Sequence, residues 1–440
     1  MRAAVGCALS ANVPPGAHVT VALSGGMDSM VLLDALADAS AAHSLRVSAI
    51  HVHHGISQNA DRWARFCAEQ CAARGIALVV QAVALDRARQ SLEAAAREAR
   101  YECLLASDSD VVALAHHADD QAETVLLQLL RGAGLRGLSA MPQFCAGRPA
   151  LLRPLLSLPR SSLAAYARLR GLLWIEDESN ADVRHKRNAL RNEIAPLIAA
   201  HFSGYPATIA RAAQHQANAS ALLDELAAID AASALDARGL DRSIFESLAP
   251  ARASNALRWF LRHEGLRAPS EARLADLLRQ LSGAAVDARV RIAHDGAEIG
   301  IHCGRVVVHA PPPLPFVHRW QGESEMKLPG GVLAFERADG RGVALARIAG
   351  APVMVRSRLG GERIRLANNR PRRSVKKLLQ EARLSQWQRQ ALPMVWCGDM
   401  LAAVPGIGVD LAFQAERDEP AWNLAWLPFE RAAMRLAEDA

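Results

Sequence analysis

A serine- and glycine-rich stretch near the N-terminus has the residue types of a phosphate-binding loop. Residues 24–29 read Ser-Gly-Gly-Met-Asp-Ser, after alternating apolar residues that end at Leu23 and before apolar residues at helical spacing up to Leu36. A strand that turns at two glycines into a helix presents backbone N–H groups at the positive end of the helix dipole. A phosphate can approach a glycine backbone closely, and the two serines can add hydroxyl donors. The pattern therefore predicts an anion site.

Asp28 makes the expected ligand more specific. Its carboxylate would repel a phosphate unless a Mg²⁺ ion lay between them, so the stretch indicates a metal–nucleotide complex. It is not a Walker A loop, because no Gly-Lys-Ser/Thr follows. On residue types alone, a strand–turn–helix with a capping Asp or Ser explains the same stretch without chemistry.

A second cluster, residues 116–124, is dense in ionisable side chains and reads His-His-Ala-Asp-Asp-Gln-Ala-Glu-Thr. Asp120 and Glu123 have the spacing of a capping box, which would satisfy the first N–H groups of a helix. Capping leaves the two histidines and Asp119 unexplained. Imidazoles and carboxylates crowded together suit a metal, an amine substrate or proton transfer. We therefore expect a functional site here, with capping as an added role.

Both clusters lie in a segment, residues 17–130, where strand and helix patterns alternate. This alternation predicts a parallel sheet with helices on both faces, a doubly wound α/β domain, and sites at the carboxyl ends of its strands. Each cluster follows such a strand, and so does a histidine-rich stretch at 51–55 that reads equally well as a polar exit loop. The expected strands are 19–23, 46–52, 76–83 and 111–115, and the later helices are 60–74, 91–106 and 120–130.

Length and composition bound the class of protein. A chain of 440 residues is expected to form two or three domains. The net charge of +6 favours a polyanionic partner. Seven cysteines without a C-x-x-C pair indicate a reducing compartment and argue against a structural zinc site. No apolar run approaches a membrane span and no signal pattern is seen, so we expect a cytoplasmic protein with no membrane partner.

The rest of the chain divides by composition. Helices are expected at 207–235, 252–261 and 272–281 and strands at 286–293 and 306–309, followed by a proline-rich boundary at 311–315. We predict a catalytic domain at 1–198, a mostly helical domain at 199–315 and a small basic α+β domain at 316–440. The middle region shows no chemistry of its own.

Two basic segments are candidates for RNA contact. Residues 356–390 hold eleven Arg or Lys and two Glu. Strands are expected at 354–358 and 363–366, then one helix capped by Ser374. Because a soluble face usually mixes charge signs, we favour contact with an RNA backbone. The basic stretch 184–191 fits a solvated helix face as well as it fits tRNA or nucleotide phosphate. The cations expected to line the C-terminal helix are Lys376, Lys377, Arg383 and Arg389.

Short motifs follow one another in order along the chain. They are His-Val-x-His-Gly at 51–55, Ala-Arg-Glu-Ala-Arg-Tyr at 96–101, the cluster at 116–124, Arg-Gly-x-Gly at 131–134, Gly-Leu-Ser-Ala-Met at 137–141, Arg-Pro-Leu-Leu at 153–156, Trp-Ile-Glu-Asp-Glu-Ser-Asn-x-Asp at 174–182 and Arg-Asn-x-x-Arg-Asn at 187–192. Residues 24–29 resemble the loop of the ATP-pyrophosphatase (PP-loop) superfamily, and the whole ordered set resembles the tRNA(Ile)-lysidine synthetases. The C-terminal stretches 360–363, 376–381 and 403–407 resemble that family too, whereas the middle domain matches only by position.

The resemblance implies an ATP-dependent ligase. ATP would adenylate the C2 oxygen of cytidine-34 in the CAU anticodon of an isoleucine tRNA, and the ε-amine of L-lysine would then displace AMP. It also implies roles for individual residues. Phosphate would be held by Ser24, Gly25, Gly26, Met27 and Ser29, and Mg²⁺ by Asp28. L-lysine or its adenylated partner would be positioned by His116, Asp120 and Glu123, and charge on the phosphate would be met by Arg97 and Arg191.

Other functions remain open on the sequence. A tRNA thiolase with the same loop would need cysteines placed for sulfur or a cluster, and a glutamine-fed amidotransferase would need a glutaminase domain or an N-terminal nucleophilic Cys. An RNA-binding module with an inactive nucleotide fold would not need the intact loop at 24–29. The residue that deprotonates the lysine amine is not indicated. The oligomeric state is also open, a homodimer included.

Overall fold

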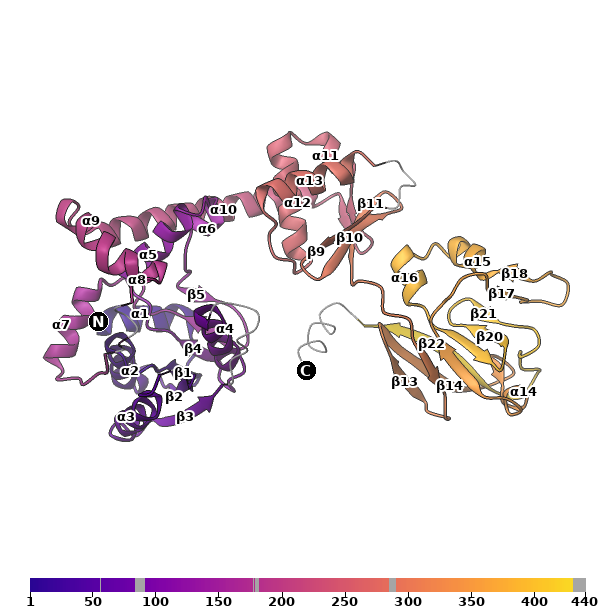
Figure 1. The fold of residues 1–440 in the computed structure, drawn as a ribbon, viewed down its shortest axis with the longest axis horizontal. Coiled ribbons are helices and arrows are strands. Elements are labelled where there is room, and N and C mark those ends of the chain that lie inside the picture. Colours follow the sequence, from indigo (N-terminus) through magenta and orange to yellow (C-terminus); the bar gives the residue numbers. More distant parts are fainter. Residues whose placement is uncertain (56, 84–91, 177, 179–181, 285–289, 430–440) are drawn as a thin grey trace. The chain divides into compact units, whose positions relative to one another are not determined.

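The structure, a computed structural model, describes the chain except for residues 56, 84–91, 177, 179–181, 285–289 and 430–440 (Figure 1). The chain forms two units, Met1–Leu223 and Asp224–Ala440. Within the described ranges, no helix is both long and apolar enough to cross a membrane.

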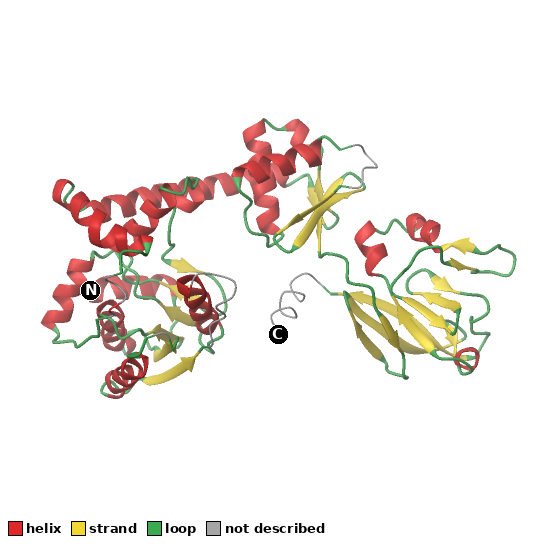
Figure 2. Cartoon of the chain, viewed as in Figure 1, coloured by secondary structure: helices red, strands yellow, loops and turns green. Residues whose placement is uncertain are grey.

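The first unit is built on a six-stranded sheet in the order β3-β2-β1-β4-β6-β5. All neighbours pair in parallel except the short edge strand β5, which runs antiparallel to β6. The predicted parallel sheet is therefore confirmed (Figure 2). Its strands are β1 (His18–Ala22), β2 (Arg46–His53), β3 (Ala77–Ala82), β4 (Val111–Ala113), β5 (Phe144–Cys145) and β6 (Ala150–Leu152).

Helices cover both faces of this sheet, because successive strand residues point to opposite sides. In β4, Val111 and Ala113 join the large core, whereas Val112 joins a second cluster with Leu104 of α4. The large core is formed with α1, α2, α3 and α7. A strand buried on both faces needs a nearly continuous apolar run, which β4 has. The helices are α1 (Arg2–Asn12), α2 (Met27–Ser40), α3 (Ala60–Ala72), α4 (Leu92–Leu105), α5 (Ala118–Leu129), α6 (Leu135–Leu138) and α7 (Arg160–Leu169).

The sheet order brings the two sequence clusters together. β1 pairs with β4 over Val19–Val111 to Val21–Ala113, so the carboxyl ends of these strands are neighbours. The 24–29 loop leaves β1 and enters α2, and the 116–124 cluster leaves β4 and enters α5. The unit ends with α8 (Lys186–Ala189), one π-helical turn, η2 (Leu190–Ile194), α9 (Ala195–His201) and the first part of α10 (Tyr205–Ala231).

In the second unit, residues 235–309 form an antiparallel sheet and three helices. The sheet order is β7-β8-β11-β10-β9, and the apolar faces of α12 and α13 pack on it. The first part of the strand expected at 286–293 lies outside the described residues. The elements are β7 (Leu235–Asp236), β8 (Gly239–Asp241), α11 (Ile244–Ser247), α12 (Pro250–His263), α13 (Glu271–Ser282), β9 (Arg291–His294), β10 (Ala297–His302) and β11 (Arg305–His309).

Residues 317–428 form two further antiparallel sheets and a short hairpin. One sheet has the order β12-β16-β19-β20-β21, the other β13-β14-β22-β15, and their facing apolar side chains make one core. The strands are β12 (Val317–Arg319), β13 (Glu325–Leu328), β14 (Gly331–Asp339), β15 (Val343–Ala344), β16 (Val353–Arg356), β17 (Arg363–Ile364), β18 (Arg373–Ser374), β19 (Met394–Cys397), β20 (Met400–Val404), β21 (Gly408–Val409) and β22 (Pro420–Pro428), with α14 (Leu345–Ile348) between β15 and β16.

The prediction of one long helix after Ser374 was wrong. The chain forms α15 (Val375–Glu381) and α16 (Gln386–Ala391), separated at Arg383, which has a left-handed φ of 56°. A second helix starts because the Ser385 side chain accepts from the backbone N–H of Gln388, in a capping box. Ser374 does stand at the N-cap of α15, but its side chain makes no capping hydrogen bond. Arg383 and Arg389 therefore do not line the helix that carries the two lysines.

Candidate active site

The 24–29 loop forms a closed turn at the start of α2, where the N–H groups of Met27, Asp28 and Ser29 have no partner among the described residues. Three hydrogen bonds close this turn. Ser24 Oγ donates to Ser29 Oγ (3.1 Å), and Ser29 Oγ donates to the carbonyl oxygen of Gly26 (2.9 Å). The N–H of Gly26 donates to Ser24 Oγ (3.3 Å). No side chain of the described residues caps α2, so the capping explanation of this stretch fails. The uncapped first turn leaves donors for an anion.

Gly25 has no room for a side chain. Its φ is +86°, and a Cβ atom there would lie 3.1 Å from Ile175 Cδ1 and 3.2 Å from Cys67 Sγ. The loop is held from the other side because the N–H of Ile175 donates to the carbonyl oxygen of Gly25 (2.9 Å). Ile175 belongs to the 174–182 motif, so that motif supports the loop directly.

His117 joins the loop to α5. Its Nε2 lies 3.6 Å from Asp28 Oδ2 and 3.3 Å from Asp120 Oδ2, and its Nδ1 lies 3.6 Å from Asp119 Oδ2. Burial alone would oppose a charge on this histidine, which is 1% exposed, but the three carboxylates outweigh it and raise the pKa of His117 to about 9. An imidazolium therefore stands among three carboxylates at neutral pH.

The capping pair of α5 differs from the one expected. The helix begins at Ala118, so His117 is the N-cap and Asp120 the third residue. The N–H of His117 donates to Asp120 Oδ2 (3.1 Å). The N–H of Asp120 lies 3.4 Å from His117 Nδ1, which can accept from it only when the imidazole is neutral. Glu123 lies too deep in the helix to cap it. The expected Asp120–Glu123 capping box was wrong, and Glu123 is available for another role.

Asp120 and Glu123 instead meet two arginines from a distant part of the chain. Arg187 donates through Nε to Glu123 Oε2 (2.8 Å) and through Nη2 to Asp120 Oδ1 (3.0 Å). Arg191 donates through Nε to Glu123 Oε1 (2.6 Å), and through Nη2 to Glu123 Oε2 and Asp120 Oδ1 (2.9 Å each). The four side chains form a carboxylate–guanidinium cluster. Burial opposes ionisation of Asp120, but the positive charges around it, His117 and Arg187 foremost, lower its pKa.

Local helical geometry explains why both arginines reach this cluster. They are four residues apart, on α8 and the π-helical turn, so they share one helix face. Single π-helical turns are frequent at functional sites. From the sequence we expected an individual role for Arg191, whereas Arg187 was only part of the basic stretch 184–191. The signal that would have found Arg187 is the repeated Arg-Asn at this spacing.

His116 and Arg97 lie near the cluster without joining it. His116 Nδ1 is buried without a hydrogen-bond partner among the described residues. Burial is the main reason that its pKa falls to about 4, so His116 is neutral at pH 7. Arg97 is exposed on α4, its guanidinium lies 5.1 Å from the centre of the Tyr101 ring, and its charge contributes to the low pKa of His116. Within the described part of the chain, no contact of Arg97 with Asp120 or Glu123 is seen.

Asp28 fits a metal ion that is held jointly with phosphates. Its Oδ1 is buried and has no hydrogen-bond partner among the described residues. The same part of the chain contains no group of three or more His, Cys, Asp or Glu that would hold a metal ion by itself. Mg²⁺ commonly takes one or two carboxylates together with substrate phosphates. Cys67, which lies next to Gly25 of the loop, does not suggest sulfur chemistry, because it is buried and burial raises the pKa of its thiol to about 12.

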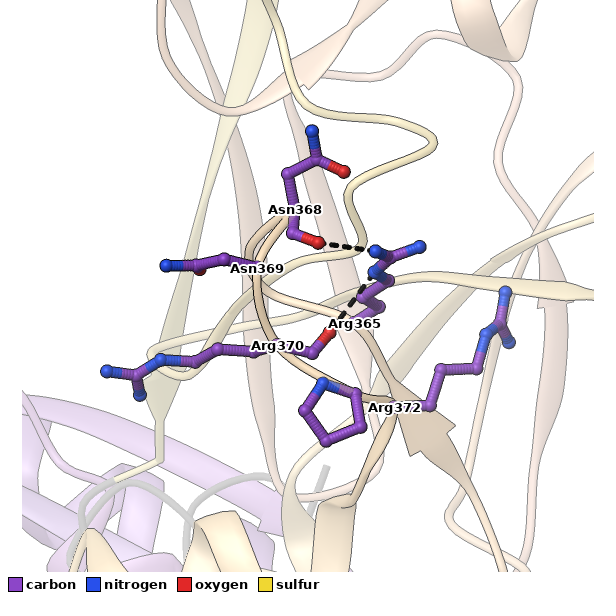
Figure 3. A pocket seen from close by; sticks show the side chains of 6 residues that line it. Arg365, Asn368, Asn369, Arg370 and Arg372 are labelled. Carbon is purple, nitrogen blue, oxygen red and sulfur yellow. Dashed lines mark hydrogen bonds between the residues drawn. The ribbon is translucent and has the colours of Figure 1, made fainter.

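A basic loop in the second unit presents cations to solvent. Residues 365 and 368–372 line a cavity of about 490 Å³. Arg365 holds the loop, because its guanidinium donates to the carbonyl oxygens of Asn368 and Arg370. Figure 3 shows the side chains of Arg370 and Arg372 extending from opposite sides of the loop. Neither has an acidic partner among the described residues, so both are free to meet phosphates. Trp387, by contrast, is only 4% exposed and is not available for base stacking.

Comparisons with known proteins cover most of the chain. Residues 8–198 match the PP-loop domain, residues 240–309 the TilS substrate binding domain and residues 353–426 the TilS substrate C-terminal domain. Three relatives are named tRNA(Ile)-lysidine synthase. Those of Nitrosomonas europaea and Azoarcus sp. are 45% and 41% identical, each over 96% of this chain and 94% of its own length. That of Ralstonia nicotianae is 42% identical over 96% of both chains. This chain belongs to the tRNA(Ile)-lysidine synthase family.

Family membership confirms the resemblance found in the sequence. The enzyme carries the ATP-binding PP-loop domain of tRNA(Ile)-lysidine synthases, and the thiolase alternative is not favoured. A solved structure of the U34-tRNA thiolase NcsA from Methanococcus maripaludis is similar over 49% of this chain and 77% of that chain, with a TM-score of 0.43 and 17% identity. That likeness is too weak to bear on the activity.

Proposed function

We propose that this enzyme joins L-lysine to C2 of cytidine-34 in the CAU anticodon of tRNA(Ile), using ATP and releasing AMP and diphosphate. The observation that carries the proposal is the contact between Asp28 of the loop and His117 of α5, 3.6 Å apart. If the 24–29 loop binds ATP and the carboxylates of α5 bind an ammonium group, as we propose, this contact supports two neighbouring sites.

The first step is adenylation of the base. The C2 oxygen of cytidine attacks the α-phosphorus of ATP, and diphosphate leaves. The N–H groups at the start of α2 and the hydroxyls of Ser24 and Ser29 hold the phosphates. Mg²⁺, held by Asp28 and the phosphates, would neutralise charge on the leaving group. We assign Arg97 and Arg191 to charge that develops on the α-phosphate.

The second step is attack by the ε-amine of L-lysine on C2, with departure of AMP. We assign Asp120 and Glu123 to the ammonium group and His116 to its orientation. The proton of the ammonium must leave before attack, since only the neutral amine is a nucleophile. His117, as an imidazolium, holds the carboxylates of Asp28 and Asp120 in place.

Contacts to tRNA come from the part of the chain that follows the catalytic domain. We propose that the domains expected at 199–315 and 316–440 bind tRNA and that the basic loop at 365–372 meets its phosphates, because cations without acidic partners suit a polyanion. The catalytic domain then corresponds to residues 1–198. We propose the cytoplasm as the site of action, since that is where the proposed substrates occur together.

The test is incubation of the protein with ATP, Mg²⁺, labelled lysine and bulk tRNA. Label should enter one tRNA species, one AMP should form for each lysine incorporated, and nuclease digestion should place the label on one cytidine. Lysine-independent release of AMP with no label in tRNA would show that the ammonium site has another substrate.

A further inference from the structure

The carboxylates proposed for the lysine ammonium are already satisfied within the protein. Arg187 and Arg191 give five hydrogen bonds to Asp120 and Glu123, between 2.6 and 3.0 Å. Asp120 Oδ2 is also occupied, by the backbone N–H and the imidazolium of His117. Both carboxylates are largely buried, with side-chain exposures of 12% and 5%.

These contacts leave too few acceptors for an incoming ammonium. An oxygen of a carboxylate has two lone pairs, and an ammonium has three donors. Asp120 Oδ1 and Glu123 Oε2 each accept two arginine hydrogen bonds. Counting the hydrogen bonds of the described residues, only Glu123 Oε1 keeps an open lone pair. A further cation at this place would also be repelled by the two guanidiniums and by the His117 imidazolium. An ammonium can bridge both carboxylates only after at least one guanidinium has moved.

ATP offers the arginines another partner. Burial opposes the charge on Arg191, but the carboxylates of Glu123, Asp120 and Asp28 raise its pKa. Because Asp28 belongs to the 24–29 loop, the guanidinium of Arg191 is close enough to interact electrostatically with the place where the phosphates would bind. A guanidinium binds phosphate oxygens in a bidentate manner as well as it binds carboxylates. Little packing opposes the movement: α8 has no buried residue and the π-helical turn has only Leu190.

We propose that Arg187 and Arg191 are internal counter-ions that occupy the lysine carboxylates until the phosphates of ATP draw them away. ATP binding then opens the ammonium site, and L-lysine binds after ATP. This inference rests on the proposed function, because it takes Asp120 and Glu123 as the lysine site. The coupling is reciprocal, so lysine raises the affinity for ATP by the same factor.

The experiment measures lysine affinity by calorimetry, without tRNA, in the absence and presence of saturating Mg²⁺ and α,β-methylene-ATP. This analogue cannot be cleaved between its α- and β-phosphates. The dissociation constant for lysine should fall at least tenfold with the analogue, within the usual range of coupling between two sites. Equal lysine affinities in the two states would overturn the proposal.

Variants of Arg187 distinguish a counter-ion of the lysine carboxylates from a residue that only binds the phosphates of ATP. Arg187→Gln should tighten lysine binding at least threefold in the absence of nucleotide and reduce the coupling factor. If Arg187 served ATP alone, the variant would weaken ATP binding and leave nucleotide-free lysine affinity unchanged, and the proposal would be wrong. Arg187→Lys keeps the charge and should restore most of the coupling. Lys186→Gln removes an exposed charge one residue away and should bind lysine like the wild type.

Failure of this inference differs from failure of the proposed function. In one outcome, lysine is incorporated into tRNA at a normal rate while the affinity of the enzyme for lysine is the same with and without the nucleotide. In that case the counter-ion proposal is wrong and the ligase activity stands. If lysine binds in neither state and no label enters tRNA, the assignment of the site itself is wrong.

Discussion

His117 Nε2 lies 3.6 Å from Asp28 Oδ2, although 89 residues separate them in the chain. This ion pair ties the first turn of α2 to the N-cap of α5. Asp28 Oδ2 is thereby paired with the buried imidazolium of His117, and Asp28 Oδ1 has no hydrogen-bond partner among the described residues. A carboxylate held in this way can serve a metal–phosphate complex without rotating away.

Replacement of Asp28 by alanine should reduce turnover at least a hundredfold and leave tRNA affinity within twofold of wild type. The reason is that we propose Asp28 for the ATP site, whereas we assign tRNA phosphates to the basic loop at 365–372 of the second unit. Rates of lysine incorporation and filter binding of tRNA check the two expectations. Asp38→Ala is the control, since Asp38 lies on the same helix and pairs with Arg2 and Arg170, away from the loop. Full activity of Asp28→Ala at saturating ATP and Mg²⁺ would remove the proposed metal role.

His117 should make stability depend on pH between about 6.5 and 9. Its folded-state pKa of about 9 lies above the ordinary value, so its contribution is full below pH 6.5 and is lost as the pH rises through 9. The difference corresponds to roughly 3 kcal/mol. His116, whose pKa of about 4 is lowered, acts in the opposite sense and below this window.

The measurement is the thermal midpoint of wild type and His117→Gln between pH 6 and 9.5. Wild type should lose stability across this range and the variant should lose much less. His201→Gln, at an exposed position, should follow the wild type. Parallel curves for wild type and His117→Gln would mean that His117 is not charged in the folded protein.

Gly25→Ala should both destabilise the first unit and weaken ATP binding. An alanine at φ +86° costs about 1–2 kcal/mol, and its Cβ would press on Ile175 and Cys67 at 3.1 and 3.2 Å. Gly16→Ala is the matched control, because Gly16 has φ +82° and no atom within 4 Å of the added Cβ. Thermal melts should show a loss for both variants. ATP affinity, measured by calorimetry, should fall only for Gly25→Ala; an equal effect on ATP in both would point to general destabilisation.

The double variant Arg370→Gln, Arg372→Gln should weaken tRNA binding and flatten its salt dependence. Removing one cation from a phosphate lowers the slope of log affinity against log salt by about 0.7–0.9. Lysine and ATP affinities should not change. Arg347→Gln is the control, since that arginine already pairs with Glu416. An unchanged slope in the double variant would show that the loop faces solvent in the complex.

The enzyme should modify a CAU tRNA of isoleucine identity and leave methionine tRNAs unmodified. Since both can carry the same target base, discrimination must come from other tRNA positions, and stems are read largely by shape and backbone. The test transplants stem pairs from the isoleucine tRNA into a methionine tRNA and measures lysine incorporation. If the hybrid stays inert while an isolated isoleucine anticodon stem-loop reacts at full efficiency, contacts distant from the anticodon are not needed.

The sequence by itself determined the local elements of the site. The strand, the 24–29 loop and the start of α2 follow from short-range apolar periodicity and two glycines, and the structure has them within a residue or two of the expected positions. The parallel sheet was also predicted correctly, from the alternation of strand and helix patterns. The sequence pattern was less reliable where the conformation of a single residue decides whether a helix continues. The basic residues predicted one helix through Arg383, but the left-handed conformation of Arg383 separates two helices there.

Only the tertiary structure decided which of these elements meet. Asp28 reaches His117 because β1 and β4 are neighbours in the sheet, an order that no local pattern encodes. Arg187 reaches Glu123, 64 residues away, because the fold brings α8 next to α5. Hydrophobic periodicity predicts which face of a helix or strand is buried. Which charged side chains of different elements form ion pairs depends on how those buried faces pack together. The counter-ions of the proposed lysine site therefore became visible only in three dimensions.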